Sequence, residues 1–482
     1  MSNSGKFLLS VILAPPFLAY KVLEAAIGGI AFAVRSRKKE SAFGDAAFMT
    51  ERELRKISKP DGLFPGVTEK GRRVRRGLEA SILMFADRGG GKTQTANANI
   101  KALKDVKVKP DLIIADDHGD IEIACREDLE KMGYKVMRID LSDPLNSQKY
   151  DPLNYLRPFA PFEYEREVER LSMLLIPDSG KESEVGQHFN DNARALVQAC
   201  IVYEMEKSIR SVNEISKLLL TDKKVRTAAF NKMRGHRNLL VQAGVEAFEA
   251  AGDREKGSME TTLNRKLKPW LSATLQHITT TDDGIDFDKM FLDPQPHALF
   301  IRTAGAEKEY SGSFIRLLMG VSIYTAKRLW NTTKKPLPKG LLLIVDEPET
   351  VGNCSAFLVA LKELRKVGVN LFICFQSLGA LKATYSDHAA IWSNCTKIIS
   401  GGSGDLELFD IASRLAGETT VESLSVSKGD RETQTKSQTG KRLVPVADFQ
   451  NLPRDEVIVI GQGILAKLKK PFHIKSNRIR YL

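Results

Sequence analysis

Short apolar runs alternate with amphipathic stretches along the first third of the chain. The runs "ASILMFA" (80–86), "DLIIADD" (111–117) and "KVMRIDLSD" (135–143) have the length of buried strands. The stretches "QTANANIKALKDV" and "IEIACREDLEKMG" lie between them and have helical spacing. Strands that alternate with helices predict an α/β fold with a mostly parallel sheet.

The pattern changes between about 155 and 285, where four amphipathic helices follow one another without a strand-like run. Strand patterns return in "HALFIRTA" (297–304), "GLLLIVDE" (340–347), "NLFICFQS" (370–377) and "KIISGGS" (397–403), and two further runs near the end close the sheet. We therefore expect an all-α domain at 155–288, inserted between two parts of a nucleotide-binding domain at 79–154 and 289–482. Polar residues 40–78 are expected to form a linker, and polar residues 425–442 an exposed loop.

The N-terminus is the most apolar region. Residues 7–34 are long enough for one tilted or kinked membrane span, although they contain Pro15, Pro16, Lys21 and Glu24. The basic run "RSRKK" follows, so residues 1–39 predict a membrane segment with a basic flank and a cytoplasmic body. A re-entrant or interfacial hairpin broken at the prolines is the alternative that we keep, and a signal peptide is disfavoured.

Composition narrows the class of partner. The 482 residues carry a formal net charge of +12, which suits a polyanion such as nucleic acid or an acidic membrane face. The five cysteines are scattered and form no C-x-x-C pair, so they predict reduced thiols rather than disulfides or a zinc site.

A glycine-rich loop follows the first predicted strand. "ADRGGGKT" (86–93) matches the phosphate-binding pattern G-x-x-x-x-G-K-[ST] except that Ala86 replaces the first glycine. Alanine serves there if its φ is negative. Lys92 is predicted to reach the β- and γ-phosphates, and Thr93 to bind Mg²⁺. The predicted nucleotide-binding residues are Asp87, Arg88, Gly89, Gly90, Gly91, Lys92, Thr93 and Gln94.

Three later positions complete a hydrolytic site. Asp346 and Glu347 end the buried run "LLLIV", where Asp346 is predicted to hold Mg²⁺ and Glu347 to polarise the attacking water. Gln376 ends another strand, where its amide can bond both the γ-phosphate and the water. Arg365 precedes that strand and can project into a neighbouring subunit's site, although a solvated arginine at a helix end is an equally good interpretation from chemistry alone.

With these residues in place, the sequence resembles the type IV coupling proteins, the TraG/TraD-type ATPases of conjugation and type IV secretion. The resemblance covers roughly residues 75–482. It rests on "DRGGGKT", "RIDLSDPLNSQKYDPLNYL", "GQHFNDNARALVQACIVYE", "KGSMETTLNRKLKPWL", "VDEPET", the Gln376 stretch with Tyr385 and Asn394, and "RLVPVADFQNLPRDEVIVIGQG".

The resemblance implies a RecA-like P-loop ATPase anchored in the bacterial inner membrane, with its body in the cytoplasm. Its cofactors would be ATP and Mg²⁺. Its partners would be a relaxase–DNA complex (the relaxosome), the components of a type IV secretion channel and, as a homo-hexamer, other copies of itself. Arg365 matches the family's arginine finger by its place between the Asp-Glu strand and the Gln strand.

The sequence also departs from the family pattern. The usual D-P-K-G-E after the second strand is "DDHGD" here, with Asp117 and His118 where proline and lysine are expected. The N-terminal segment is too short for two spans. Two alternatives stay open: a receptor that recruits protein effectors with little DNA translocation, and a septal-type DNA-partitioning motor.

Overall fold

The computed structural model describes residues 42–59, 61–77, 80–178, 183–207, 211–281, 283–303, 308–401, 404–427, 433–471 and 480–481. The chain divides into two compact units. The larger unit holds residues 48–415 and 444–482, and the smaller holds residues 1–47 and 416–443.

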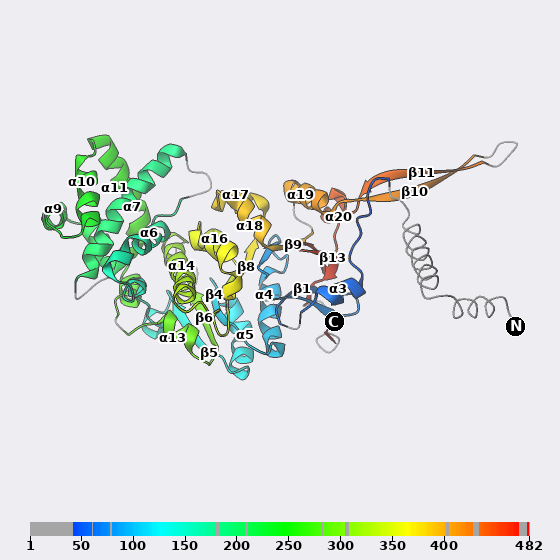
Figure 1. Ribbon diagram of the computed structural model, residues 1–482, viewed down its shortest axis with the longest axis horizontal. Helices are drawn as coiled ribbons and strands as arrows, with labels where there is room; N and C mark the ends of the chain where they lie inside the picture. Colours follow the sequence, from blue (N-terminus) through cyan, green and yellow to red (C-terminus); the bar gives the residue numbers. More distant parts are fainter. Residues whose placement is uncertain are drawn as a thin grey trace, which may run out of the picture. The chain divides into compact units, whose positions relative to one another are not determined.

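A single sheet organises the larger unit, with strand order β14-β2-β1-β13-β12-β9-β3-β8-β7-β4-β6-β5 (Figure 1). The strands from β9 to β5 in this order run parallel, and antiparallel β12, β13 and β1 extend the sheet beyond β9. The predicted α/β fold with a mostly parallel sheet is therefore confirmed. The bounds are β1 Leu63–Val67, β2 Arg72–Arg76, β3 Ile82–Phe85, β4 Asp111–Ala115, β5 Lys135–Asp140, β6 His297–Arg302, β7 Leu341–Val345, β8 Val369–Phe375, β9 Thr396–Ser400, β12 Glu456–Gly461, β13 Ile464–Lys469 and β14 Arg480–Tyr481.

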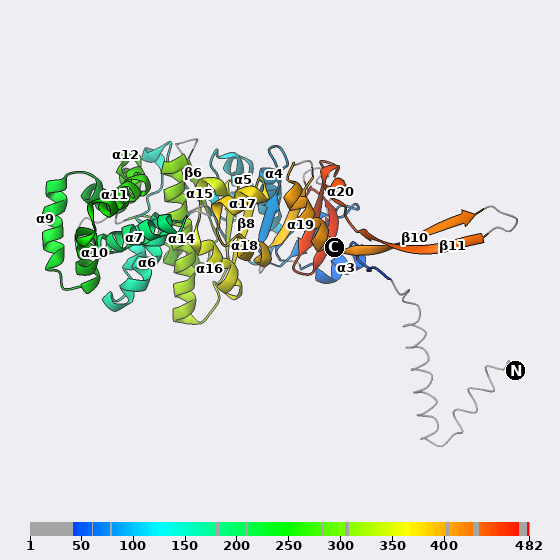
Figure 2. The same ribbon diagram turned by 90° about the horizontal axis from the view of Figure 1, so that it is seen from above.

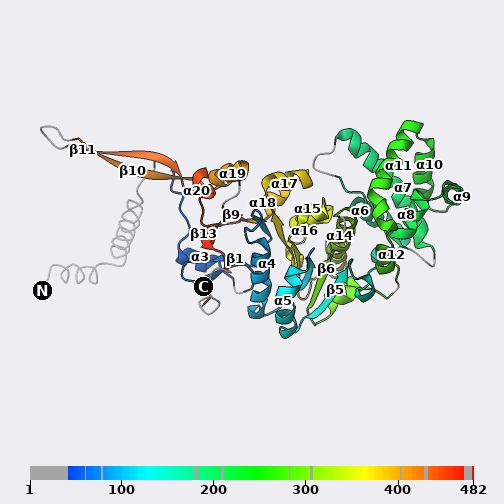
Figure 3. The same ribbon diagram turned by 180° about the vertical axis from the view of Figure 1, so that it is seen from behind.

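Helices cover the two faces of this sheet (Figure 2). Two of them, α4 (Lys92–Lys101) and α5 (Asp120–Lys131), lie side by side on one face, as Figure 3 also shows. Their apolar side chains pack on alternate residues of the strands, such as Ile82 and Met84 of β3. Right-handed crossovers explain the arrangement, because the chain moves along the sheet in one direction from β3 to β5 and in the opposite direction from β5 to β9. The remaining helices of this part are α3 Glu51–Ile57, α14 Lys308–Thr333, α15 Pro348–Val351, α16 Ser355–Glu363, α17 Leu378–Thr384, α18 His388–Asn394, α19 Leu406–Ala416 and α20 Val446–Gln450.

The segment between β5 and β6 is helical, with no strand among its described residues. Trp270 of this segment is fully buried and donates a hydrogen bond from Nε1 to Ser313 Oγ of α14, at 2.9 Å. The helical domain is thereby joined to α14, while its exact limits stay predictions. Its helices are α6 Tyr164–Leu175, α7 Glu184–Met205, α8 Val212–Leu220, α9 Lys223–Arg234, α10 Leu239–Ala250, α11 Asp253–Leu267, α12 Ala273–Thr279 and α13 Phe287–Leu292, with short 3₁₀ turns between several of them.

The linker prediction for residues 40–78 is wrong over most of its length. Residues 51–57 form α3, and β1 and β2 pair into the main sheet. The basic run "RRVRR" misled the prediction because charge normally marks a solvated segment. Here Arg75 is 1% exposed and donates to the carbonyls of Gly62 and Ala102, at 3.2 and 3.1 Å.

The predicted loop at 425–442 is also wrong in part. In the smaller unit, β10 (Glu418–Ser427) and β11 (Thr433–Arg442) pair along ten antiparallel positions. The sequence of β11 contains no apolar residue, and the few apolar residues of β10 do not alternate regularly, which is why hydrophobic periodicity did not indicate strands.

The predicted membrane segment at 7–34 lies outside the described residues. Within the described ranges, no helix combines the length and the apolar character that crossing a bilayer requires.

Candidate nucleotide-binding site

The predicted site residues gather at one edge of the sheet. Because β3, β7 and β8 are parallel, the segments that follow them all leave at the carboxyl edge. The helices after β3 and β8 cover opposite faces, and ligands of open α/β sheets bind at such a switch point. The structure thereby brings the glycine loop, Asp346, Glu347 and Gln376 to one edge.

The glycine loop turns from β3 into α4 as the sequence predicted. Gly89 and Gly91 have φ values of +76° and +88°, which favour glycine, and Gly91 begins the helix. Ala86 is 1% exposed, has no positive φ, and still donates its N–H to Phe375 O of β8 at 3.1 Å. The exception in the motif is therefore a strand-end residue, and the prediction for Ala86 is confirmed.

Gly90 is required by close approach rather than by its dihedral angles. A Cβ at this position would lie 2.8 Å from the Cβ of Ala86 and 2.9 Å from the carbonyl oxygen of Asp87. The loop can keep this tight curve only with glycine at 90.

The amino end of α4 is electrostatically open. No side chain caps it and its first turn contains no acidic residue. Lys92, its first residue, donates from Nζ to the carbonyls of Ala86 and Asp87 at 2.7 and 3.2 Å. Free N–H groups, the helix dipole and a lysine thus converge where an anion can bind.

Thr93 and Asp346 meet across the loop, although 253 positions separate them in the sequence. Thr93 donates from Oγ1 to Asp346 Oδ2 at 2.5 Å. The other carboxylate oxygen, Oδ1, is buried and accepts no N–H or O–H hydrogen bond from the described residues. Burial raises the pKa of Asp346, while the Thr93 hydrogen bond and the Lys92 charge oppose the shift.

These oxygens are the ligand types that Mg²⁺ takes. In the described ranges, no group of three or more His, Cys, Asp or Glu is arranged to hold a metal ion by itself. Mg²⁺ that is shared with phosphates needs only one or two protein ligands, so a hydroxyl and a carboxylate with a free buried oxygen fit it.

Glu347 and Gln376 border the same edge. Glu347 precedes α15, and Gln376 is exposed directly after β8. A third residue, which the sequence reasoning missed, joins them: the Glu349 carboxylate accepts the backbone N–H of Gln376. Burial raises the pKa of Glu349, and this hydrogen bond opposes the shift. The acidic spacing in "DEPET" was the available signal.

Arg365 lies elsewhere. It is exposed on a short 3₁₀ turn before β8, so the seven residues of β8 put it roughly 20 Å from the phosphate loop of its own chain. It lines a pocket of about 700 Å³ with Lys327, Trp330 and Lys366. Arg365 is therefore placed to act outside its own site or not at all.

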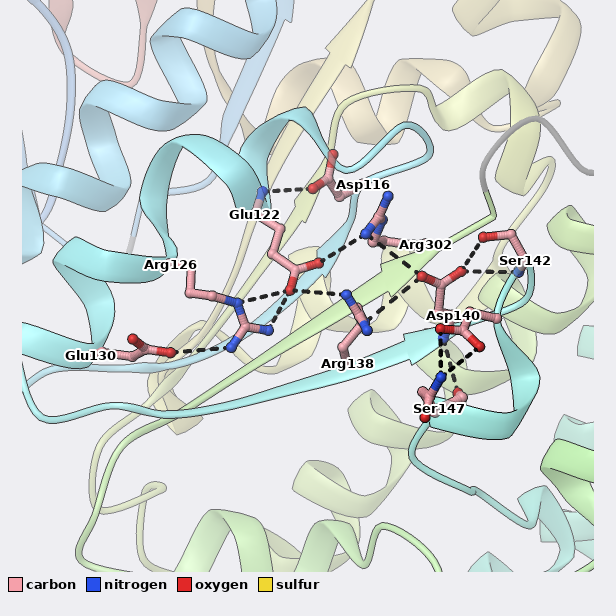
Figure 4. Close-up of polar contacts among 11 residues, drawn as sticks. Asp116, Glu122, Arg126, Glu130, Arg138, Asp140, Ser142, Ser147 and Arg302 are labelled. Atoms are coloured by element: carbon pink, nitrogen blue, oxygen red, sulfur yellow. Dashed lines mark hydrogen bonds and ion pairs between the residues drawn. The ribbon is translucent and has the colours of Figure 1, made fainter.

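A second strand–loop–helix unit stands at the same edge, from β4 into α5. Asp116, the first residue after β4, accepts the N–H groups of Ile121 and Glu122 at 3.2 and 2.7 Å. Figure 4 shows how charged residues surround this helix end, where Glu122 and Asp140 lie among Arg126, Arg138 and Arg302. The amino end of α5 is thus filled by a carboxylate of its own chain.

Two buried cations near the site had no counterpart in the sequence predictions. Lys470, which follows β13, contacts the glycine loop from outside and donates to Gly90 O at 2.9 Å. Arg316 of α14 donates to Leu174 O of α6 and to Val351 O, both at 2.7 Å. Tyr385 of the family motif donates to Gly352 O at 3.3 Å, so the segment after Glu347 is held from two sides.

The parallel sheet, the open glycine loop and the Thr93–Asp346 contact define a P-loop nucleotide-binding protein. Comparison with known proteins narrows this class. Residues 37–480 match the sequence profile of the type IV secretory system conjugative DNA transfer family. Because this match covers most of the chain, the protein belongs to that family, the type IV coupling proteins.

Individual relatives agree with this assignment. The chain is 22% identical over 476 residues to the type IV secretion system-coupling protein VirD4 of Bartonella quintana, covering 89% of this chain and 72% of the relative. It is 21% identical to VirD4 of Bartonella henselae, of which it covers 54%. Among solved structures, the bacterial conjugative coupling protein TrwBdeltaN70 matches with a TM-score of 0.67 at 18% identity, covering 89% of this chain and 96% of that one. TrwB in complex with ADP and Mg²⁺ matches with a TM-score of 0.65.

Proposed function

We propose that this chain is a membrane-anchored ATPase that recruits a relaxase–DNA complex to a type IV secretion channel and drives DNA transfer. The observation that carries the proposal is the 2.5 Å contact between Thr93 and Asp346, because it joins the phosphate loop to the acidic end of β7. TrwB, which shares the fold, binds ADP and Mg²⁺. Family membership supports the conjugative role.

Each of the predicted site residues would have its own role in ATP hydrolysis. The backbone N–H groups of 89–93, with Asp87, Arg88 and Gln94 beside them, hold and orient the phosphates, and Lys92 exchanges its carbonyl partners for phosphate oxygens. Thr93 and Asp346 would be the protein groups that hold Mg²⁺. A bound Mg²⁺ supplies positive charge against the β- and γ-phosphate oxygens. Glu347 orients and polarises the attacking water, and Gln376 bonds the γ-phosphate side of the site.

Arg365 would act in the site of a neighbouring copy. Its position at the far edge of the sheet from its own loop supports this assignment, as does its exposure. An arginine supplied by a neighbour neutralises transition-state charge and can contribute a factor of about 10³–10⁵ in rate. A closed ring, such as a homo-hexamer, would give every site such a neighbour.

Hydrolysis by the full chain, purified in mild detergent, tests the proposal. We expect ATP hydrolysis to rise when DNA is added, and to fall by on the order of 10²-fold or more in Lys92→Ala. Lys101→Ala on the same helix is the matched control, since this exposed lysine pairs with Asp128 at 3.2 Å and lies at the opposite end of α4 from the loop. A DNA-independent rate, together with DNA binding that salt does not weaken, would contradict the motor and favour effector recruitment.

Mixing two inactive chains tests the role of Arg365. In mixed oligomers of Lys92→Ala and Arg365→Ala chains, some sites combine an intact Lys92 with an intact Arg365 from a neighbour. Activity should therefore return on mixing. No recovery, with both variants still assembling, would place Arg365 outside the catalytic site.

A further inference from the structure

Lys470 is a buried lysine directly after β13, one of the antiparallel strands that extend the sheet beyond β9. Along β13, alternate residues Ile464, Ala466 and Leu468 are buried and pack on the same face of the sheet as α4. Lys470 continues this alternation and is 2% exposed. Because β13 runs in the same direction as β3, its carboxyl end lies at the phosphate-loop edge.

The ammonium group of Lys470 touches the phosphate loop itself. Its Nζ donates to Gly90 O at 2.9 Å and to Ser400 Oγ at 2.8 Å. Loops of this kind turn their N–H groups inward to phosphate and their carbonyls outward. Lys470 therefore holds the back of the loop at the glycine whose curve is most constrained.

The charge of Lys470 has no carboxylate beside it. Its neighbours in sequence are balanced: Lys467 lies 2.7 Å from Glu456, and Lys469 lies 2.7 Å from Asp455. Among the described residues, no Asp or Glu oxygen lies within ion-pair distance of Lys470 Nζ. A buried cation without a partner destabilises a fold unless something else supplies negative charge.

We infer that Lys470 is a second lysine of the phosphate site. It binds the Gly90 carbonyl, and its uncompensated positive charge attracts bound phosphates on the other side of the loop. The inference deepens the proposed function because it needs the nucleotide site, but it does not need hydrolysis. The bound ligand class is a nucleoside di- or triphosphate, whose negative charge offsets the burial of the ammonium.

The electrostatics of the position agree with this geometry. Burial lowers the pKa of Lys470, and the more distant carboxylates of Asp87 and Asp455 only partly oppose the shift. Without ligand the charged form is thus less stable than that of a lysine in water. An anion on the inner side of the loop reverses that balance.

Lys470→Met in the full chain tests whether the charge of Lys470 serves ligand binding or the stability of the fold. Methionine keeps the unbranched shape and removes the charge, so the melting temperature without nucleotide should stay equal or rise. The Kd for ADP should increase by about tenfold or more, while binding of adenosine, which has no phosphate, stays unchanged. Lys467→Met, which removes an exposed, paired lysine of the same strand, should leave both ligands unaffected.

Lys470→Gln adds a variant that keeps an N–H donor but has no charge. It should bind ADP as weakly as Lys470→Met, and wild-type affinity in it would overturn the role of the charge. An unchanged ADP Kd in Lys470→Met, or an equal loss for ADP and adenosine, would overturn the inference as a whole. These results stand apart from the proposed function, which fails instead if the wild-type chain binds ADP but does not hydrolyse ATP.

Discussion

Two strand–loop–helix units at one sheet edge have the same topology and opposite electrostatics. After β3, Ala86 donates its N–H to the last residue of β8, and after β4, Asp116 donates its N–H to Ile301 of β6. Ala86 leaves the following helix end open, with no acid in its first turn. Asp116 fills the end of α5 with its carboxylate, and Asp120 and Glu122 add charge there. The fold offers several helix ends at this edge, and one side chain per loop decides which can take an anion.

The largest expected effect on nucleotide binding comes from distorting the glycine loop between β3 and α4. In Gly90→Ala the new Cβ meets the Cβ of Ala86 at 2.8 Å and Asp87 O at 2.9 Å, so the loop must shift. We expect the Kd for ADP to rise by about tenfold or more, measured by calorimetry. Ala86→Gly in the same chain should restore part of the affinity. Gly257→Ala is the control, because a Cβ at this position of α11 would meet no other atom, and it should leave the Kd for ADP unchanged.

The second-largest effect is expected from removing the carboxylate that fills the amino end of α5. Asp116→Ala leaves the N–H groups of Ile121 and Glu122 without their acceptor, which should lower the free energy of unfolding by about 1 kcal/mol. Denaturant unfolding measures this loss. Nucleotide affinity should stay the same, and a fall in ADP binding of the size seen in Gly90→Ala would contradict the division of roles.

A smaller change makes the open helix resemble the filled one. Gln94 is exposed at the third position of α4, where α5 carries Glu122. Gln94→Glu should weaken ADP binding by about two- to fivefold through repulsion at the helix end. The effect should shrink at high salt because the position is exposed. A salt-independent loss would point to steric interference instead.

The smallest effect is a pH dependence at the filled end. Burial raises the pKa of Asp116, and the two backbone hydrogen bonds oppose the shift. A raised folded-state pKa means that the stabilising contribution is complete below the unfolded value and is lost as pH rises through the folded one. Wild type should therefore gain stability relative to Asp116→Asn between pH 7 and pH 4 in urea unfolding. An opposite trend would mean that the hydrogen bonds outweigh burial.

The sequence predicted the residues of the nucleotide site better than the residues that hold the site and the sheet in place. A glycine run between a strand and a helix, and Asp-Glu after an apolar run, are local patterns, and parallel topology then brings them together. Arg75 and Lys470 were missed because charge in a basic run usually marks solvent, although the alternation of Ile464, Ala466 and Leu468 does place Lys470 inward. The β10–β11 ribbon was missed because its pairing depends on the partner strand rather than on an apolar face.

The five cysteines carry a practical consequence for following this molecule at work. All five lie in described parts of the chain, and all are buried free thiols. Burial raises the pKa of Cys125, Cys354 and Cys395 to about 12, so few of these thiols are in the reactive thiolate form. A single cysteine introduced at exposed Lys366, next to Arg365, would then react with a fluorophore or cross-linker far ahead of the native ones. The natural sequence is already suited to site-specific labelling of the surface around Arg365.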